Sequence, residues 1–243
     1  MKNIIFLLIT FFLSINLWSQ TGDEIIKKME ENQLHDSSIY DAVMEIHDRF
    51  GKRIKTLKIY TSGEDNVMLE FTNPEEEGQK ILRLADEIYL YFPDAEEVIH
   101  LQGNALKDSV MGSDFSYEDM TDEGSVIDQY NIVNKGITDL DGHKVYKLEL
   151  TATSKKAVYA RQSIWVDTKL FVTRKGVFYS KSGKLLRELI VYEIKTISGK
   201  NVPTKIEMID KMKKNSKTIF ILSNLKINVP VDPDLFSLEE LSW

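Results

Sequence analysis

The sequence contains no cysteine. This absence excludes disulfides and cysteine-ligated metal sites, although it leaves an oxidising compartment open to the protein. A chain of this length needs no crosslinks, because a single domain of about 200 residues buries roughly 70% of the surface that its unfolded chain exposes. We therefore expect one domain whose hydrophobic core is large enough to stabilise it without crosslinks.

Long hydrophobic runs are missing beyond the N-terminus. The one apolar run, Ile4 to Phe12, follows Lys2 and leads to a polar exit at Ser19. A cationic start, a short apolar centre and a polar exit are typical of a secretory signal peptide. We expect residues 1–20 to be a cleaved signal peptide that directs the export of a single domain, residues 21–243. An uncleaved membrane anchor is the alternative, which the shortness of the run disfavours.

The linear sequence also lacks clusters of basic residues. Lys and Arg number 31 against 38 Asp and Glu, which gives a formal net charge of −7 at pH 7. An acidic balance without a basic run argues against nucleic acid as a partner and against electrostatic docking on anionic lipid heads.

Catalytic and metal-binding motifs are missing as well. None of the four histidines belongs to an H-E-x-x-H pattern. Ser109 and Ser113 lack the G-x-S-x-G elbow that exposes a nucleophile. No glycine-rich loop precedes a helix, so phosphate binding has no support. The sequence therefore predicts neither an enzyme nor a bound cofactor or metal; a hydrolase with a dyad assembled across strands is kept as an alternative.

One acidic segment does contain the ligand type that calcium prefers. Its carboxylates are close together, but their spacing does not match the D-x-[DN]-x-[DN]-G pattern of a calcium loop. We expect a solvated loop in which Asp114 or Asp119 caps a turn. The carboxylates are Asp108, Asp114, Glu118, Asp119, Asp122 and Glu123.

Most of the sequence after the N-terminal run consists of segments in which apolar and polar residues alternate. Thr21 to Leu34 has a helical period, and Thr21 and Glu24 are spaced as a capping box. From Ser38 onward the period is two, as in strands with one buried face. Short segments of this kind follow one another almost to the end, separated by turn residues. They predict a mainly β domain with about eleven or twelve strands in a single meandering antiparallel sheet or barrel.

One long irregular stretch, residues 102–128, interrupts the strand rhythm. At its centre, residues 111–120 read MGSDFSYEDM. Gly, Ser and Asp favour turns, whereas Phe115 and Tyr117 can pin a loop onto an apolar surface. We expect a structural corner that closes the sheet, with direct contact to a bound hydrophobic molecule through the two aromatic rings as the alternative. The residues expected to build the corner are Gly112, Ser113, Asp114, Glu118 and Asp119.

The order of these segments resembles that of the LolA-like outer-membrane lipoprotein-sorting proteins. Besides GSDFSYED, the resemblance rests on six segments spread over nearly all of the chain that follows the signal peptide. They are F-T-N-P at 71–74, I-Y-L-Y-F-P at 88–93, Y-K-L-E-L at 146–150, I-W-V-D at 164–167, S-G-K-L-L at 182–186 and D-P-D-L-F at 232–236.

The resemblance implies an incomplete, half-open antiparallel β-barrel, with an N-terminal helix and a helical or loop lid over an apolar cavity. It also implies a monomeric, non-catalytic periplasmic carrier of lipid or lipoprotein acyl chains, for transfer towards the outer membrane. Members of this branch are often linked to RND-type (MMPL-like) lipid exporters. An inner-membrane transporter of that type or an outer-membrane acceptor is therefore an expected partner. The alternative is a non-catalytic envelope accessory or scaffold protein of such an exporter.

Aromatic residues and methionines on the amphipathic strands and in the irregular stretch are candidates for the cavity or its lid. The alternative for each is an ordinary closed core, because the sequence does not reveal which face of the sheet lines a cavity. The candidates are Met44, Phe71, Tyr89, Tyr91, Met111, Phe115, Tyr117 and Trp165.

Overall fold

A computed structural model describes residues 20–33, 36–120 and 125–242. The expected signal peptide lies outside these ranges except for its last residue, Gln20, and so do Leu34, Asp122 and Glu123. Within the described ranges, no helix is both long enough and apolar enough to cross a membrane.

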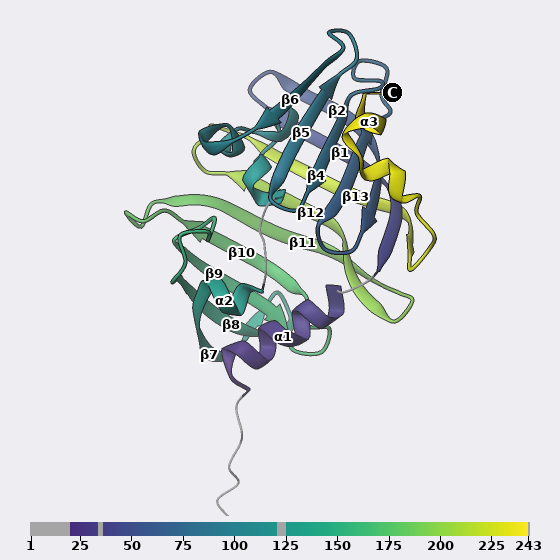
Figure 1. Ribbon diagram of the computed structural model, residues 1–243. Coiled ribbons are helices and arrows are strands. Elements are labelled where there is room, and N and C mark those ends of the chain that lie inside the picture. The colour runs from purple at the N-terminus through teal and green to yellow at the C-terminus, as the bar shows by residue number, and fades with distance from the viewer. Residues whose placement is uncertain (1–19, 34–35, 121–124, 243) are drawn as a thin grey trace, which may run out of the picture.

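One antiparallel sheet of thirteen strands forms the body of the molecule (Figure 1). Its strand order is β6-β5-β4-β3-β2-β1-β13-β12-β11-β10-β9-β8-β7, so β6 and β7 are the edges and the sheet is not closed into a barrel. The predicted mainly β, half-open architecture is confirmed. Thirteen strands form instead of about eleven or twelve, because every short alternating segment pairs as a strand of its own. The strands are β1 (Ser37–Asp48), β2 (Gly51–Ser62), β3 (Asn66–Phe71), β4 (Lys80–Leu84), β5 (Glu87–Phe92), β6 (Glu97–Leu101), β7 (Tyr130–Leu140), β8 (His143–Ala152), β9 (Arg161–Asp167), β10 (Thr173–Tyr179), β11 (Leu185–Ile197), β12 (Lys200–Asp210) and β13 (Lys217–Ile227).

The sheet consists of two meanders that meet at its centre. Strands β1 to β6 run outward to one edge, whereas β7 to β13 run from the other edge back to the centre, where β13 pairs with β1. The chain between β6 and β7 therefore connects the two edges of the curled sheet. We call residues 102–120 and 125–129 the crossover segment. It contains the 3₁₀ turns η1 (Gly103–Lys107), η2 (Val110–Gly112) and η3 (Tyr117–Met120) and the short helix α2 (Val126–Gln129).

The predicted N-terminal helix is α1 (Gly22–Gln33). Its capping box forms as expected: the Thr21 N–H donates to Glu24 Oε2 at 2.8 Å, and the Glu24 N–H donates to Thr21 Oγ1 at 3.2 Å. Ile25 and Ile26 are buried in a cluster with side chains of β7, β8 and β9. A Cβ at Gly22 would clash with Ile132, so glycine lets the first turn approach the sheet. The helix thus covers the second half of the sheet (Figure 1).

The outer face of β3, β4 and β5 is covered by the C-terminal tail. This tail contains η4 (Pro233–Phe236) and α3 (Leu238–Leu241). Leu241 is fully buried in a cluster with Met68 and Leu82. The Lys80 ammonium also donates to the Glu240 carbonyl at 2.9 Å, which ties the tail to the sheet. The concave face is left to α1 in one half and to the crossover segment in the other.

Candidate ligand-binding cavity

The concave face of the first half carries an apolar cavity of about 330 Å³. Side chains at alternate positions of a strand share one face, and this alternation puts the lining residues of β1, β2, β3 and β13 on the same side of the sheet. Val110 and Phe115 of the crossover segment complete the wall. The lining residues are Tyr40, Met44, Leu57, Ile59, Val67, Leu69, Arg83, Val110, Phe115, Asp119 and Phe220.

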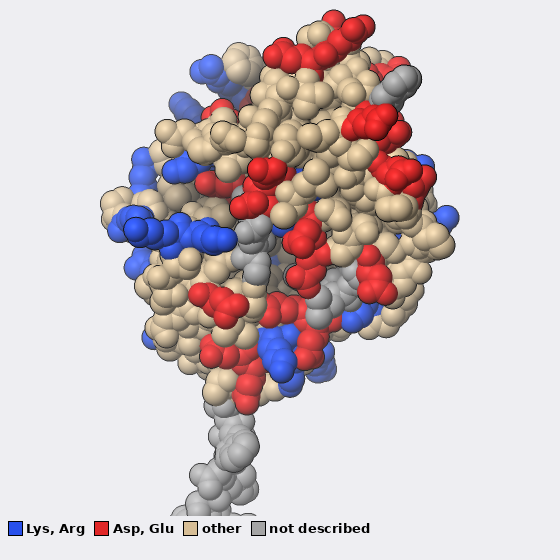
Figure 2. All heavy atoms as spheres, in the orientation of Figure 1, with Lys and Arg blue, Asp and Glu red and all other residues tan. Residues whose placement is uncertain are grey.

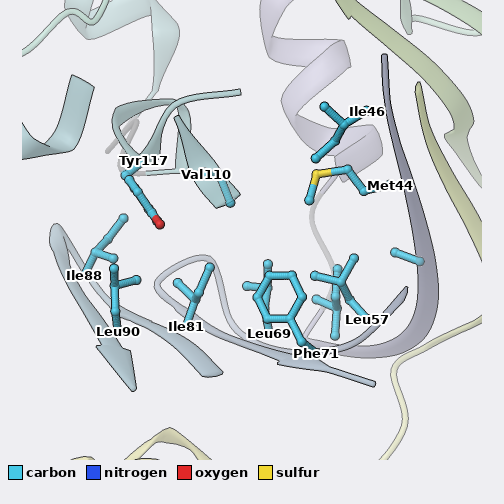
Figure 3. Packing of buried hydrophobic residues seen from close by; sticks show 12 residues of the cluster. Met44, Ile46, Leu57, Leu69, Phe71, Ile81, Ile88, Leu90, Val110 and Tyr117 are labelled. Atoms are coloured by element: carbon cyan, nitrogen blue, oxygen red, sulfur yellow. The ribbon is translucent and has the colours of Figure 1, made fainter. Parts of the chain in front are cut away.

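The crossover segment forms a roof over this part of the sheet (Figure 3). Val110 and Tyr117 lie opposite strand residues that include Ile81 and Ile88, and all four are buried in one cluster. Farther along the same face, Met44 belongs to the cluster and also borders the cavity. The roof is therefore packed at the β4–β5 side and leaves unfilled space over β1 to β3.

Two charged side chains line this cavity among the described residues. Arg83 donates from Nε to the Ala85 carbonyl at 2.7 Å and from Nη1 to the Glu64 carbonyl at 3.2 Å. These bonds hold its guanidinium near the turn between β2 and β3. Asp119 is neutralised by an ion pair with Arg187. Burial raises the pKa of Tyr40, already above neutral pH, to about 12, so this side chain adds no charge to the cavity wall.

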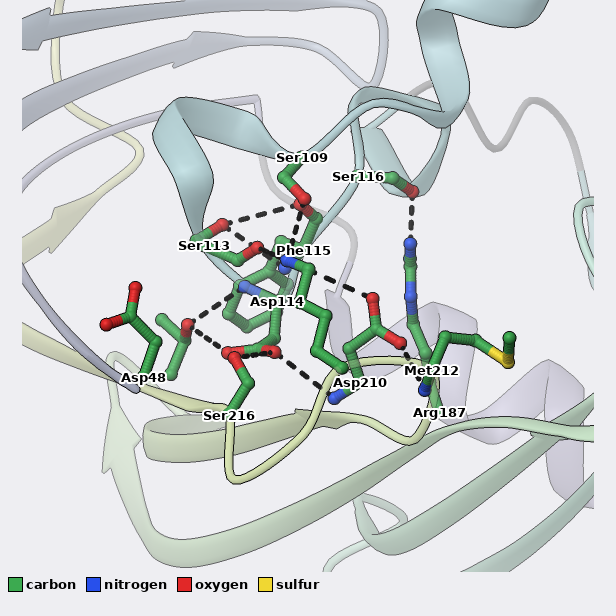
Figure 4. A network of polar contacts seen from close by, with 12 residues as sticks. Asp48, Ser109, Ser113, Asp114, Phe115, Ser116, Arg187, Asp210, Met212 and Ser216 are labelled. Atoms are coloured by element: carbon green, nitrogen blue, oxygen red, sulfur yellow. Dashed lines mark hydrogen bonds and ion pairs between the residues drawn. The ribbon is translucent and has the colours of Figure 1, made fainter. Parts of the chain in front are cut away.

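Asp114 anchors the roof to the hairpin between β12 and β13 (Figure 4). Its fully buried carboxylate accepts hydrogen bonds from Ser216 Oγ at 2.6 Å and Thr218 Oγ1 at 2.7 Å. The Asp114 N–H donates in turn to Thr218 Oγ1 at 2.9 Å, and the Asp210 N–H reaches the carboxylate at 3.3 Å. A buried carboxylate is tolerated only when its oxygens are satisfied in this way. The predicted solvated environment is therefore wrong for Asp114.

Asp119 anchors the roof a second time, to β11. Its carboxylate forms an ion pair with Arg187 and accepts a hydrogen bond from Tyr159 Oη at 2.5 Å. Arg187 Nη1 also donates to Ser116 Oγ at 2.8 Å (Figure 4). Burial and the Asp119 charge raise the pKa of the Tyr159 hydroxyl, so it stays protonated. Asp119 also caps its own turn, as one sequence interpretation proposed, because its Oδ2 accepts from the Ser116 N–H at 2.7 Å.

A lysine and a tight turn complete the attachment. Lys213 donates to Ser109 Oγ at 2.7 Å and to the Ser113 carbonyl at 2.5 Å. Met111 and Gly112 both have positive φ, 49° and 76°, and this reversal turns the buried Ser113 towards the hairpin. Glu118 is half-buried, and burial raises the pKa of its carboxyl. The polar residues of the motif thus attach the crossover segment to the β12–β13 hairpin and to β11, beside the cavity.

The structure separates the eight candidate aromatic and methionine residues into three groups. Met44 and Phe115 line the cavity, and the Phe115 ring lies 6.0 Å from that of Phe220. Phe71 and Tyr117 are buried in the adjoining cluster, against which Met111 packs. The third group, on the outer face, consists of Tyr89, Tyr91 and Trp165.

The three residues on the outer face contact the C-terminal tail or lysine side chains instead of the cavity. Tyr89 and Tyr91 pack against the cluster around Leu241, beneath the C-terminal tail. The Trp165 ring lies between the ammonium groups of Lys147 and Lys175, at 5.4 and 5.8 Å from its centroid. None of these three rings borders the cavity described here.

Most aliphatic residues of the wall were not singled out from the sequence. Leu57 and Ile59 lie on β2, which pairs with the strand of Met44, and Val67 and Leu69 lie on β3, the next strand; all four line the same cavity. Their alternation with polar residues was the available signal, but it marks both a cavity wall and a closed core. Within the described ranges, no three His, Asp or Glu side chains lie close enough together to hold a metal ion.

Solved structures share this architecture closely. A DUF1329 family protein from Desulfovibrio piger matches with a TM-score of 0.85 and 24% identity, over 90% of this chain and 97% of that chain. A domain assigned to outer membrane lipoprotein sorting, from Vibrio parahaemolyticus, matches with a TM-score of 0.82 and 21% identity, over 91% and 98%. A LolA superfamily protein from Nitrosomonas europaea matches with a TM-score of 0.74 and 22% identity, over 91% and 100%. The fold is therefore LolA-like, as the sequence resemblance predicted.

The sequence also matches a family model over most of its length. The model is described as "Uncharacterized protein" and matches residues 63–243. The chain belongs to this family. No curated protein matches the sequence.

Proposed function

We propose that this protein is a non-enzymatic carrier that holds an acyl chain of a lipid or lipoprotein in the cavity under the crossover segment. The observation that carries the proposal is the apolar wall of that cavity, supplied by four strands and roofed by Val110 and Phe115. Such a surface recognises ligands by apolar area and fit, not by polar contacts. Binding of this kind requires no reactive side chain.

The size of the cavity supports a single chain of moderate length. A volume of about 330 Å³ accommodates on the order of ten methylene groups, if each occupies about 30 Å³ as a water molecule does. Each methylene gains roughly 0.8 kcal/mol on leaving water, whether it enters a bilayer or a protein. The cavity and the membrane are then comparable environments, so cargo can pass between them without a large energy input.

The proposed setting is the periplasm. Residues 1–20 would act as the signal peptide and residues 21–243 as a monomeric carrier domain. An inner-membrane RND/MMPL-type exporter would donate cargo, or an outer-membrane acceptor would receive it. The LolA superfamily and lipoprotein-sorting names of two similar structures support this setting.

Binding of a fluorescent fatty acid to the purified, lipid-free protein tests the cavity. Val67→Phe places a ring in the unfilled space, and we expect it to weaken binding about tenfold or more. Val43→Phe is the matched control, because Val43 precedes Met44 on β1 and faces the other side of the sheet. Salt should change binding little, because the interaction is apolar. Equal affinity in Val67→Phe and wild type would place the ligand elsewhere.

Native mass spectrometry of protein purified gently from envelope extract tests the cargo. A bound lipid or acylated peptide is the expected result and names the cargo class. Protein that carries no lipid, takes up no fatty acid and co-purifies with a membrane protein would contradict the carrier role. That outcome would instead favour an accessory role beside a transporter.

A further inference from the structure

Four connections of the sheet lie side by side at one end of the molecule. They are residues 48–53, 210–216, 180–184 and 153–160, which join β1–β2, β12–β13, β10–β11 and β8–β9. The register fixes their common location, because His47 lies opposite Lys217, Arg187 opposite Asp210, and Tyr179 opposite Arg161. We call these four connections the basic end.

The basic end has the opposite charge to the molecule as a whole. Its four connections contain ten Lys or Arg residues and two carboxylates, in a chain of net charge −7. The carboxylates, Asp48 and Asp210, face Arg53 at 2.7 Å and Lys213 at 3.9 Å. Lys52 and Lys211 are paired with Glu45 and Glu188 of the adjacent strands, at 3.0 and 2.7 Å, and a net positive charge still remains. In Figure 2, Lys and Arg side chains gather along the left edge, whereas Asp and Glu predominate over the rest of the visible face.

A hollow of about 400 Å³ opens between two of these connections and the crossover segment. Arg49, Lys213 and Lys214 line it, together with Gly112 and with Asp48, whose carboxylate is paired with Arg53. The guanidinium of Arg53 lies beside Gly112 as well, 3.5 Å from the position that a Cβ would occupy there. Guanidinium and ammonium groups that converge on a hollow of this size suit a phosphate group.

Apolar side chains project from the same end. The Phe50 side chain is 79% exposed and Met212 is 52% exposed, on the tips of neighbouring hairpins. The Arg49 guanidinium lies over the Phe50 ring, 4.6 Å from its centroid. Aromatic rings beside cations at an exposed tip match the boundary between lipid headgroups and acyl chains.

We propose that the basic end docks on membranes that contain anionic phospholipids, with lipid phosphates in the hollow and Phe50 and Met212 in the interface. A membrane satisfies both the charge and the exposed apolar tips, whereas nucleic acid or an acidic protein would use the charge alone. The acidic balance of the whole chain argued against such docking. Folding assembles the cluster from four segments that are distant in the chain.

The basic end is also attached to the roof of the cavity. Asp114 of the roof is bonded to Ser216, and Lys213 donates to Ser113. Docking would thus bring the crossover segment to the membrane surface. The proposal does not depend on the identity of any cargo.

Co-sedimentation with vesicles tests the proposal. We expect the purified protein to bind vesicles of phosphatidylcholine and phosphatidylglycerol but not of phosphatidylcholine alone, and to be released by salt. Phe50→Glu and the double variant Arg49→Glu, Lys214→Glu should each lower partitioning about tenfold or more.

Two control variants carry changes of the same kind at sites away from the basic end. Ile137→Glu alters a side chain that is 61% exposed on the edge strand β7, and Lys144→Glu reverses an exposed charge at the opposite end of the sheet. Both should bind vesicles like wild type. Absence of binding to anionic vesicles at low salt would overturn the proposal. An equal loss of vesicle binding in the basic-end variants and in the two controls would overturn it as well. Thermal unfolding of each variant ensures that folded proteins are compared.

Discussion

The two halves of the concave face are built from the same kind of strand but are filled differently. In the second half, α1 lays Ile25 and Ile26 onto β7, β8 and β9, and these side chains are almost completely buried. In the first half, the crossover segment supplies only short 3₁₀ turns, and a cavity of about 330 Å³ remains. A regular amphipathic helix presents a continuous apolar stripe to a sheet. The short 3₁₀ turns of the crossover segment present no such continuous stripe.

The difference shows how one curled sheet can combine stability with binding. The filled half supplies close packing, which stabilises the fold. The roof of the other half is attached by directional bonds of Asp114 and Asp119, together with the packing of Val110 and Tyr117 at the β4–β5 side. Directional contacts fix the position of the roof and leave the space below it free for a ligand. The following predictions test this division between the halves.

The largest expected difference concerns core truncation. Leu148→Ala in the filled half should cost about 2–5 kcal/mol of unfolding free energy, because Leu148 is fully enclosed. Met44→Ala should cost less, about 2 kcal/mol, because Met44 borders empty space and makes fewer contacts on that side. Urea denaturation of the lipid-free proteins measures both values. Equal costs would mean that the cavity side is packed as closely as the helix side.

The fold was largely readable from the sequence because its signals are local. Alternation of apolar and polar residues from Ser38 onward located the strands, and the Thr21–Glu24 spacing located the start of the helix. The pairing of β1 with β13 was not predicted. It joins residues such as Ser38 and Ile227, which are far apart in the chain, and alternation specifies a face but not a partner.

The site was less predictable, for the same reason. The sequence suggested a structural corner around Asp114, but it could not supply the partners Thr218, Ser216 and Arg187, which come from distant parts of the chain. Tyr89 and Trp165 were candidates because they are aromatic residues on strands. They lie on the outer face, because a shift of one position along a strand moves a side chain to the other face.

A second prediction concerns the turn that receives the end of α1. Asp167 Oδ1 accepts from the Lys169 and Leu170 N–H groups at 2.9 and 3.0 Å, and its Oδ2 accepts from Arg174 Nε at 2.7 Å. The Leu170 carbonyl in turn accepts from Asn32 of the helix at 3.3 Å. Asp167→Asn should therefore cost about 1.5–3 kcal/mol at neutral pH, the range for hydrogen bonds to a charged group.

The pH dependence of this effect has a definite sign. Burial would raise the pKa of Asp167, but its hydrogen bonds and Arg174 outweigh burial and hold the pKa below its ordinary value. The contribution of the Asp167 carboxylate to the free energy of unfolding is therefore complete above its pKa in the unfolded chain, about 3.9. It is lost as the pH falls through the pKa of Asp167 in the folded protein. Urea midpoints of wild type and Asp167→Asn should converge below about pH 4. A constant difference at all pH values would contradict the assignment, and fatty-acid binding at pH 7 should not change.

The smallest expected effect concerns the capping box of α1. Thr21→Ala removes the Oγ1 acceptor of the Glu24 N–H and should cost about 1 kcal/mol. Thr21→Ser keeps the acceptor and is the matched control. Because α1 fills only the second half, amide hydrogen exchange should accelerate in the helix and in β7 to β9, while the Met44 side of the sheet and its fatty-acid affinity stay unchanged. If Thr21→Ala weakened fatty-acid binding as strongly as Val67→Phe does, the two halves would be coupled, and the helix itself would have to be counted as part of the binding site.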